Sequence, residues 1–190
     1  MKWWWVRHAP THARAAIGWT DIAPDLSDAA ALARLAGALP QAPVVSSDLA
    51  RARLTADRLA QGRPRLADEP GLRELNFGAW EGLAFDAIAA RHPDDYAAFW
   101  ANPGPARATG GEGFDDLAAR IGAVIERMNG AEGAIVAVAH AGAIHAALAR
   151  AAGLSARQAL AFRLDPLSVT RLDWLAGAQA WRVEGVNLRL

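Results

Sequence analysis

The chain has 190 residues, of which 53% are hydrophobic and 21% charged, so it can bury one sizeable core but is short for two independent domains. Its twenty basic and twenty acidic residues cancel to a formal charge of zero, which disfavours binding to nucleic acid or an anionic membrane surface. The sequence contains no cysteine, which excludes disulfides, thiolate metal sites and cysteine nucleophiles. No apolar run approaches the ~20 residues of a membrane span and no signal peptide is visible, which predicts a cytoplasmic protein.

Three short apolar runs predict buried strands, because each is bounded by turn or polar residues and lacks helical periodicity. They are Lys2–Val6, Pro43–Ser46 and Ala134–Ala139. A segment of helical composition follows each strand, and these segments are Ser27–Leu39, Arg51–Ala60 and Ala143–Ala152. This alternation favours an α/β fold, specifically a three-layer α/β/α sandwich with a mostly parallel central sheet.

Two regions depart from that alternation. Between the second and third strands, helical patterns surround the Pro- and Gly-rich stretch NPGPARATGGEG, and they cover Phe85–Arg91, Tyr96–Trp100 and Phe114–Met128. We therefore expect a single domain over residues 1–190 with a helical cap insertion at about 83–130. Near the C-terminus, Ser168–Trp174 and Ala180–Val186 alternate at period two around Gly177, which predicts a β-hairpin at the sheet edge.

Polar side chains follow the predicted strands where each one ends. Arg7 and His8 follow the first strand, Arg51 lies just past the second and His140 follows the third. The ligand crevice of an open α/β sheet lies at the carboxyl ends of its strands, so these residues are expected to meet there. Two guanidinium groups suit a tetrahedral oxyanion, which makes phosphate the natural ligand. Singly, each residue is more often a surface charge or a structural histidine, and the prediction depends on their coincidence.

Four segments in order, VRHAPTH, SSDLARARLTA, LRELNFGAWEGL and VAHAGAI, resemble segments of the histidine phosphatase superfamily, also called the phosphoglycerate mutase-like superfamily. The resemblance places the family's Arg-His pair on Arg7 and His8, its second arginine on Arg51, its proton donor on Glu74 and its second histidine on His140. It spans nearly the whole chain.

The resemblance implies a metal-independent phosphomonoesterase that needs no cofactor. His8 would attack phosphorus and form a phosphohistidine, while Arg7, Arg51 and His140 would hold the phosphate oxygens. Glu74 would protonate the leaving group as general acid and then act as base toward water. The sequence leaves Glu81, seven residues further on in the same motif, as a competing proton donor.

Some positions depart from the family's pattern or extend it. Ala9 replaces the usual glycine after the nucleophile, and Arg14 stands where many members have an asparagine that touches substrate. The loop Gly110–Gly113 resembles a Gly-Glu-Ser motif of related phosphatases. Thr11, Arg14 and Glu112 are therefore the further candidate substrate-binding residues, and no metal-ligand spacing is recognisable.

In its length, its helical insertion and its Gly-Gly-Glu loop, the chain resembles the small-molecule phosphatases of the superfamily. These include the phosphatases that act on α-ribazole 5′-phosphate. Two alternatives stay open, a phosphoglycerate-type mutase and a non-catalytic phospholigand-binding protein, although all four catalytic positions carry competent residues. We expect a small phosphate ester as the partner, rather than nucleic acid or a membrane. Trp3, Trp4 and Trp5 fit a strand covered on both faces, whereas an exposed edge there would indicate a homodimer.

Overall fold

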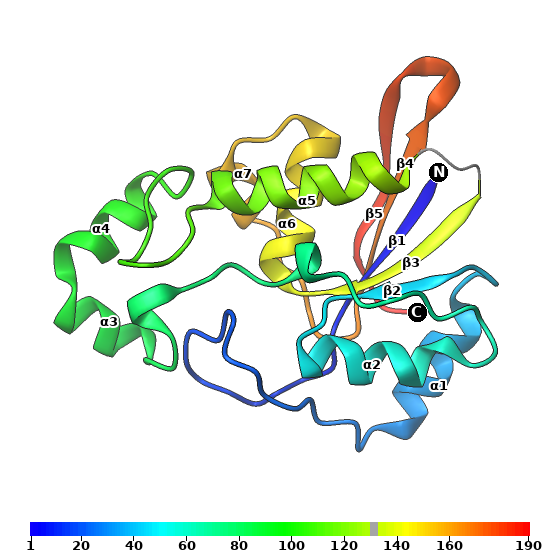
Figure 1. The fold of residues 1–190 in the computed structure, drawn as a ribbon, viewed down its shortest axis with the longest axis horizontal. Coiled ribbons are helices and arrows are strands. Elements are labelled where there is room, and N and C mark those ends of the chain that lie inside the picture. Colours follow the sequence, from blue (N-terminus) through cyan, green and yellow to red (C-terminus); the bar gives the residue numbers. More distant parts are fainter. Residues whose placement is uncertain (130–132) are drawn as a thin grey trace.

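A computed structural model describes residues 1–129 and 133–190, so residue 130, the expected end of the insertion, lies outside the described residues. Its centre is a five-stranded sheet with the strand order β2-β3-β1-β4-β5 (Figure 1). The strands are β1 (Lys2–Arg7), β2 (Val44–Ser46), β3 (Ala134–Ala139), β4 (Val169–Leu175) and β5 (Ala180–Leu188). The first three are mutually parallel, β4 runs antiparallel to β1, and β5 runs antiparallel to β4 as the predicted edge hairpin.

Helices cover both faces of this sheet (Figure 1). On one face, α1 (Ala29–Ala38) and α2 (Ala50–Ala60) pack on the alternate valines of the strands. On the other face, α5 (Phe114–Met128) and α6 (Ala141–Ala152) enclose Trp3 and Trp5, and the short α7 (Ala156–Leu160) packs against α6. The predicted three-layer α/β/α sandwich is therefore confirmed, with one face of the strand alternation directed to each helical layer.

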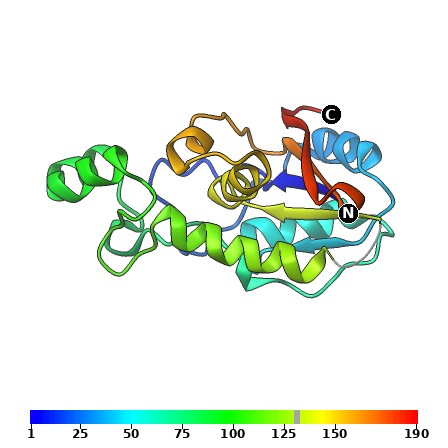
Figure 2. The same ribbon diagram turned by 90° about the horizontal axis from the view of Figure 1, so that it is seen from above.

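The helices α3 (Phe85–Arg91) and α4 (Pro93–Ala101) project together from one end of the sandwich (Figure 2). Trp80 joins them to the body, because its ring lies edge-on to that of Phe99 with 5.5 Å between centroids. Trp80 is only 2% exposed, as expected for core packing. The third helix of the same stretch, α5, lies instead on the sheet layer, where Leu117 and Ile121 are buried.

Local capping explains where several helices begin. The side chain of Asp28 accepts a hydrogen bond from the N–H of Ala31 at 2.9 Å, so α1 begins two residues later than the hydrophobic pattern indicated. The helix α7 was not predicted, although Ser155 and Gln158 form a capping box at its start. None of the helices in the described ranges is long and apolar enough to cross a membrane.

The buried Arg63 connects the C-terminal ends of α1 and α2. Its guanidinium donates to the carbonyl of Ala36 in α1 at 2.7 Å and to that of Leu39, which follows α1, at 2.8 Å. It also donates to the carbonyl of Leu59 in α2 at 3.1 Å. These carbonyls are among those that a helix end leaves without an internal partner. One side chain therefore satisfies two helix ends and fixes the helical layer beside β2.

Candidate active site

His8 follows β1 directly and continues its hydrogen bonding, with its N–H donating to the carbonyl of Ala139 at 3.0 Å. In the ring, Nδ1 lies 2.7 Å from the carbonyl of Ala9. A carbonyl only accepts, so Nδ1 carries the proton and Nε2 keeps its lone pair. Burial lowers the pKa of His8 to about 3, the bond to Ala9 opposes this shift, and the nearby Arg51 and Arg7 add to it. His8 is therefore a neutral imidazole with a nucleophilic Nε2.

His140 follows β3 and faces His8, with 5.1 Å between the ring centroids and 62° between the ring planes. The side chain is fully buried, and neither ring nitrogen has a hydrogen-bond partner among the described residues. Burial lowers the pKa of His140 well below its ordinary value, and His8, Arg51 and Arg120 lower it further. Buried polar atoms without a partner are rare in native proteins, so these two nitrogens mark a place for a polar ligand.

Arg7 ends β1 and is held by the chain on either side of it. Its main-chain N–H donates to Ser168 at 3.1 Å and its Nη1 donates to the carbonyl of Leu164. The buried Nε has no hydrogen-bond partner in the described part of the chain. Burial lowers the pKa of Arg7, while the carboxylates of Glu74 and Asp165 raise it. A cationic donor thus lies at the same sheet edge as the two histidines.

Arg51, in the first turn of α2, is 1% exposed and binds the main chain of residues 17–20. Its guanidinium donates to the carbonyls of Gly18 at 2.6 Å and Thr20 at 3.0 Å. Burial lowers the pKa of Arg51, and the carboxylates of Glu74, Asp21 and Glu81 raise it. The predicted second arginine therefore also organises a loop next to the site.

Ala9, the residue that replaces the family's usual glycine, is fully buried. Its N–H donates to Oγ1 of Thr55 at 3.0 Å, and that hydroxyl donates to the carbonyl of Arg51 at 2.7 Å. These two bonds join the end of β1 to the first turn of α2. They hold the segment that carries His8 in register with the segment that carries Arg51.

Glu74 lies at the N-terminal end of α6. Its Oε2 accepts from the N–H of Gly142 at 3.1 Å and its Oε1 accepts from the N–H of Leu75 at 2.9 Å. A Cβ at Gly142 would lie 2.2 Å from Oε1, so no other residue fits there without moving the carboxylate. The helix predicted from the sequence begins two residues too late, because a glycine in the first turn is typical of a break in a helix. The two N–H groups therefore fix the position of the Glu74 carboxyl group at the start of the helix.

Glu81 has a different environment. Its carboxylate accepts five hydrogen bonds, from the N–H groups of Gly18, Trp19, Thr20 and Phe77 and from the hydroxyl of Thr20. Burial opposes ionisation of Glu81, but these bonds offset it and hold the pKa of its carboxyl below the ordinary value. Arg51 and Glu81 therefore bind the carbonyls and the amides of the same loop from opposite sides. A carboxylate that accepts five bonds is poorly suited to donate a proton, which favours Glu74 of the two.

The remaining predicted residues lie outside this cluster. Glu112 forms an ion pair with Arg120 at 2.7 Å and accepts from the N–H of Asn76 at 3.0 Å. Thr11 is half-buried and Arg14 is exposed, and neither has a hydrogen bond to another described residue. Arg120 on α5 was not predicted, and it donates to the carbonyl of Glu74 at 3.2 Å. No sequence signal identifies it, because its role depends on α5 lying beside the segment that precedes Glu74.

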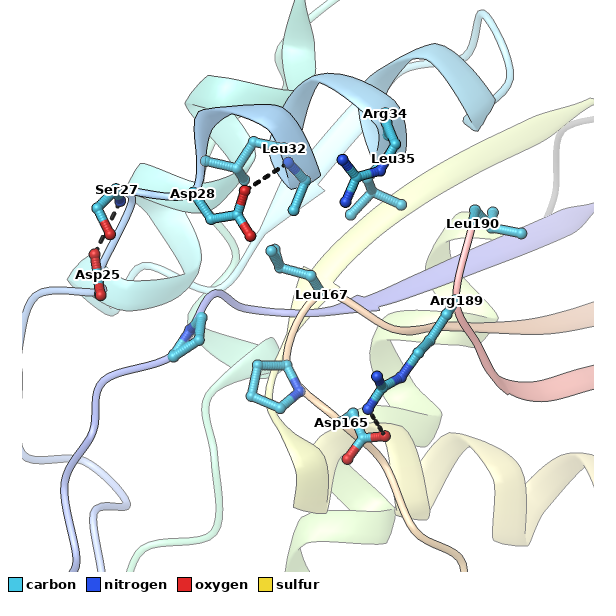
Figure 3. A pocket seen from close by; sticks show the side chains of 13 residues that line it. Asp25, Ser27, Asp28, Leu32, Arg34, Leu35, Asp165, Leu167, Arg189 and Leu190 are labelled. Carbon is cyan, nitrogen blue, oxygen red and sulfur yellow. Dashed lines mark hydrogen bonds and ion pairs between the residues drawn. The ribbon is translucent and has the colours of Figure 1, made fainter.

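A pocket of about 390 Å³ lies beside α1, between residues 165–167 and the end of the chain (Figure 3). Of the described residues that line it, none belongs to the predicted site. Its carboxylates are already bound within the protein, since Asp165 pairs with Arg189 at 2.7 Å and Asp25 pairs with His12 at 2.8 Å. Within residues 1–129 and 133–190, no three or more His, Asp or Glu side chains are placed to hold a metal ion.

The fold and the residues gathered at its sheet edge define an α/β enzyme that handles phosphate. The chain belongs to the histidine phosphatase superfamily (branch 1), whose family model matches residues 3–188. It is thus a phosphatase, as the sequence motifs indicated.

Individual relatives resemble the chain over almost its full length. The adenosylcobalamin/α-ribazole phosphatase of Salmonella typhimurium is 29% identical over 195 residues, which cover 96% of this chain and 95% of that protein. The structure of a mycobacterial glucosyl-3-phosphoglycerate phosphatase is similar with a TM-score of 0.86 and 26% identity, covering 100% of this chain and 99% of the other. The structure of the α-ribazole phosphatase of Shigella flexneri is similar with a TM-score of 0.85 and 24% identity, covering 100% of this chain and 97% of the other. At that identity, the similarity supports the fold alone.

Proposed function

We propose that this protein hydrolyses a small phosphate monoester without a metal, through a phosphohistidine formed on His8. The observation that carries the proposal is the protonation state of His8, which lies near Arg7 and Arg51. Its Nδ1 proton is bound to the carbonyl of Ala9 at 2.7 Å and its pKa is lowered to about 3, so Nε2 is an unprotonated nucleophile at neutral pH. A histidine that attacks phosphorus must be in this state.

In the first step, Nε2 of His8 forms a bond to phosphorus while the bond from phosphorus to the ester oxygen breaks. The buried Nε of Arg7 and the ring nitrogens of His140 have no other partner among the described residues, and phosphate oxygens would supply one. Phosphoryl transfer is accelerated chiefly by positioned groups that stabilise the charge on these oxygens. Glu74 gives its proton to the departing ester oxygen, so the alcohol leaves neutral.

In the second step, water attacks the phosphohistidine. Glu74, now a carboxylate, takes a proton from that water as the new bond to phosphorus forms and the bond to Nε2 breaks. The step releases inorganic phosphate and returns His8 and Glu74 to their starting states. One carboxyl group serves both steps, as general acid and then as base.

Two metabolites are the leading substrates. The Salmonella relative supports α-ribazole 5′-phosphate, and the mycobacterial structure supports glucosyl-3-phosphoglycerate. We place α-ribazole 5′-phosphate first, because the chain is 29% identical to the Salmonella relative and 26% identical to the mycobacterial one.

The test is phosphate release from both metabolites, 3-phosphoglycerate and p-nitrophenyl phosphate in the presence of EDTA. Wild type should release phosphate and His8→Ala should not. His12→Ala is the matched control, because His12 is an exposed histidine close in sequence that binds Asp25, and it should keep full activity. A wild type that releases phosphate only when a divalent metal is added would contradict the proposal. Isomerisation of 3-phosphoglycerate faster than phosphate release would indicate a mutase, and ester binding without turnover would indicate a binding protein.

A further inference from the structure

Trp19 is an exposed tryptophan that the proposed chemistry does not use. It is 37% exposed, although the chain buries other tryptophans such as Trp3 and Trp5 completely. It belongs to the loop that Arg51 and Glu81 hold from opposite sides. Large exposed aromatic side chains next to a site are characteristic of ligand contact rather than of core packing.

Three contacts hold Trp19, one through its main chain and two through its ring. Its main-chain N–H donates to Glu81 at 2.7 Å, and its indole Nε1 donates to the carbonyl of Glu74 at 2.9 Å. The guanidinium of Arg73 lies over the ring at 4.8 Å from the centroid, and Asp48 holds that guanidinium at 2.6 Å. A ring that is immobilised before binding loses little entropy when a ligand stacks on it.

The bond to Glu74 determines which part of a substrate the ring can meet. Glu74 is the proposed proton donor, so the ester oxygen of the leaving group must lie within hydrogen-bond reach of its carboxyl. The indole of Trp19 is bound to the main chain of this same residue. The indole is thus held by the main chain of the residue whose side chain would meet the leaving group, which puts the ring on the leaving-group side of the proposed site.

We infer that Trp19 is a specificity-determining residue on which a planar ring of the leaving group stacks, so the enzyme prefers phosphate esters that carry a flat heterocycle. This inference depends on the proposed function. The inference favours α-ribazole 5′-phosphate over glucosyl-3-phosphoglycerate as the substrate, because the first carries an aromatic base and the second does not. Stacking of one base on an aromatic side chain is worth about tenfold in affinity or more.

The experiment compares two phosphate esters of ribose, adenosine 5′-monophosphate and ribose 5-phosphate. The first carries a planar adenine base on the sugar and the second carries a hydroxyl group in its place. In wild type, kcat/KM should be about tenfold higher for the nucleotide. Trp19→Leu should reduce this ratio to about one, and Trp19→Phe should keep most of it because a ring remains. Trp181→Leu is the matched control, since Trp181 lies on the hairpin next to the opposite end of β1 and should leave the ratio unchanged.

A purely structural role for Trp19 predicts a different result. Loss of the bond from Nε1 to Glu74 would slow both esters equally, and it would do so in Trp19→Phe as much as in Trp19→Leu. That pattern, or a wild-type ratio near one, would overturn the inference. Hydrolysis of p-nitrophenyl phosphate in the same preparations tests the proposed function separately, because its failure in wild type would refute the phosphatase mechanism rather than the role of Trp19.

Discussion

Acid should destabilise this protein through His8. Its pKa is about 3 in the folded chain, against 6.5 for an ordinary histidine, because burial disfavours the charged ring. Between these two values the unfolded chain binds a proton that the folded chain does not bind. The free energy of unfolding is therefore highest above pH 6.5 and falls as the pH is lowered toward 3.

The size of the effect follows from the lowered pKa. At about pH 4.5, two units below the ordinary pKa of histidine, the lowered pKa of His8 should reduce the free energy of unfolding by about 3 kcal/mol relative to about pH 7.5. The assay is urea unfolding of wild type and His8→Asn at both pH values. Asparagine does not titrate, so the variant should lose about 3 kcal/mol less stability than wild type over this interval.

His140 is present in both proteins and burial, the largest cause of its lowered pKa, is common to both, so most of its contribution cancels in this difference. Equal losses of stability in wild type and His8→Asn would refute the reasoning. They would mean that His8 is protonated in the folded state at about pH 4.5, and a neutral nucleophile at that pH would then be excluded as well.

Three further outcomes are expected. Glu81→Gln should weaken the binding of inorganic phosphate about tenfold in titration calorimetry, because the loop that orients Arg51 loses its charged acceptor; unchanged affinity would count against this role. Gly142→Ala should lower kcat by about 10² or more, because its Cβ would lie 2.2 Å from the Glu74 carboxylate, whereas Gly37→Ala, with open space around the added Cβ, should not. Arg63→Met should reduce the free energy of urea unfolding by about 3 kcal/mol while leaving KM unchanged, and a changed KM would show that the two helix ends position the site.

Most of the fold could be predicted, because hydrophobic patterns report burial directly. Lys2–Arg7 and Ala134–Ala139 are central strands covered on both faces, and such strands appear in the sequence as continuous apolar runs. Helix limits were less predictable where a side chain from elsewhere decides them. The first turn of α6 contains Gly142 because Glu74 approaches it, and nothing near Gly142 in the sequence announces that approach.

Some residues of the candidate site could likewise be predicted from the sequence, and others could not. Motif spacing identified His8, and strand order brings it against His140, which lies far away in the sequence. The family resemblance placed the proton donor on Glu74 but left Glu81 open, since both are acidic residues of one motif. The five donors around Glu81 are a separate, structural reason to favour Glu74. Trp19 and Arg120 were missed because both reach Glu74 through its main-chain carbonyl, a group that every residue has.

The position of β1 bears on how the enzyme would lose activity on heating. This strand lies between β3 and β4, and it places Trp3 and Trp5 in one buried cluster and Val6 in the other. Amide protons in such a strand exchange with solvent only when the whole domain opens. His8, the proposed nucleophile, is thus attached to the segment expected to open last. Thermal inactivation should follow global unfolding in its rate and in its dependence on denaturant, rather than the earlier opening of surface loops.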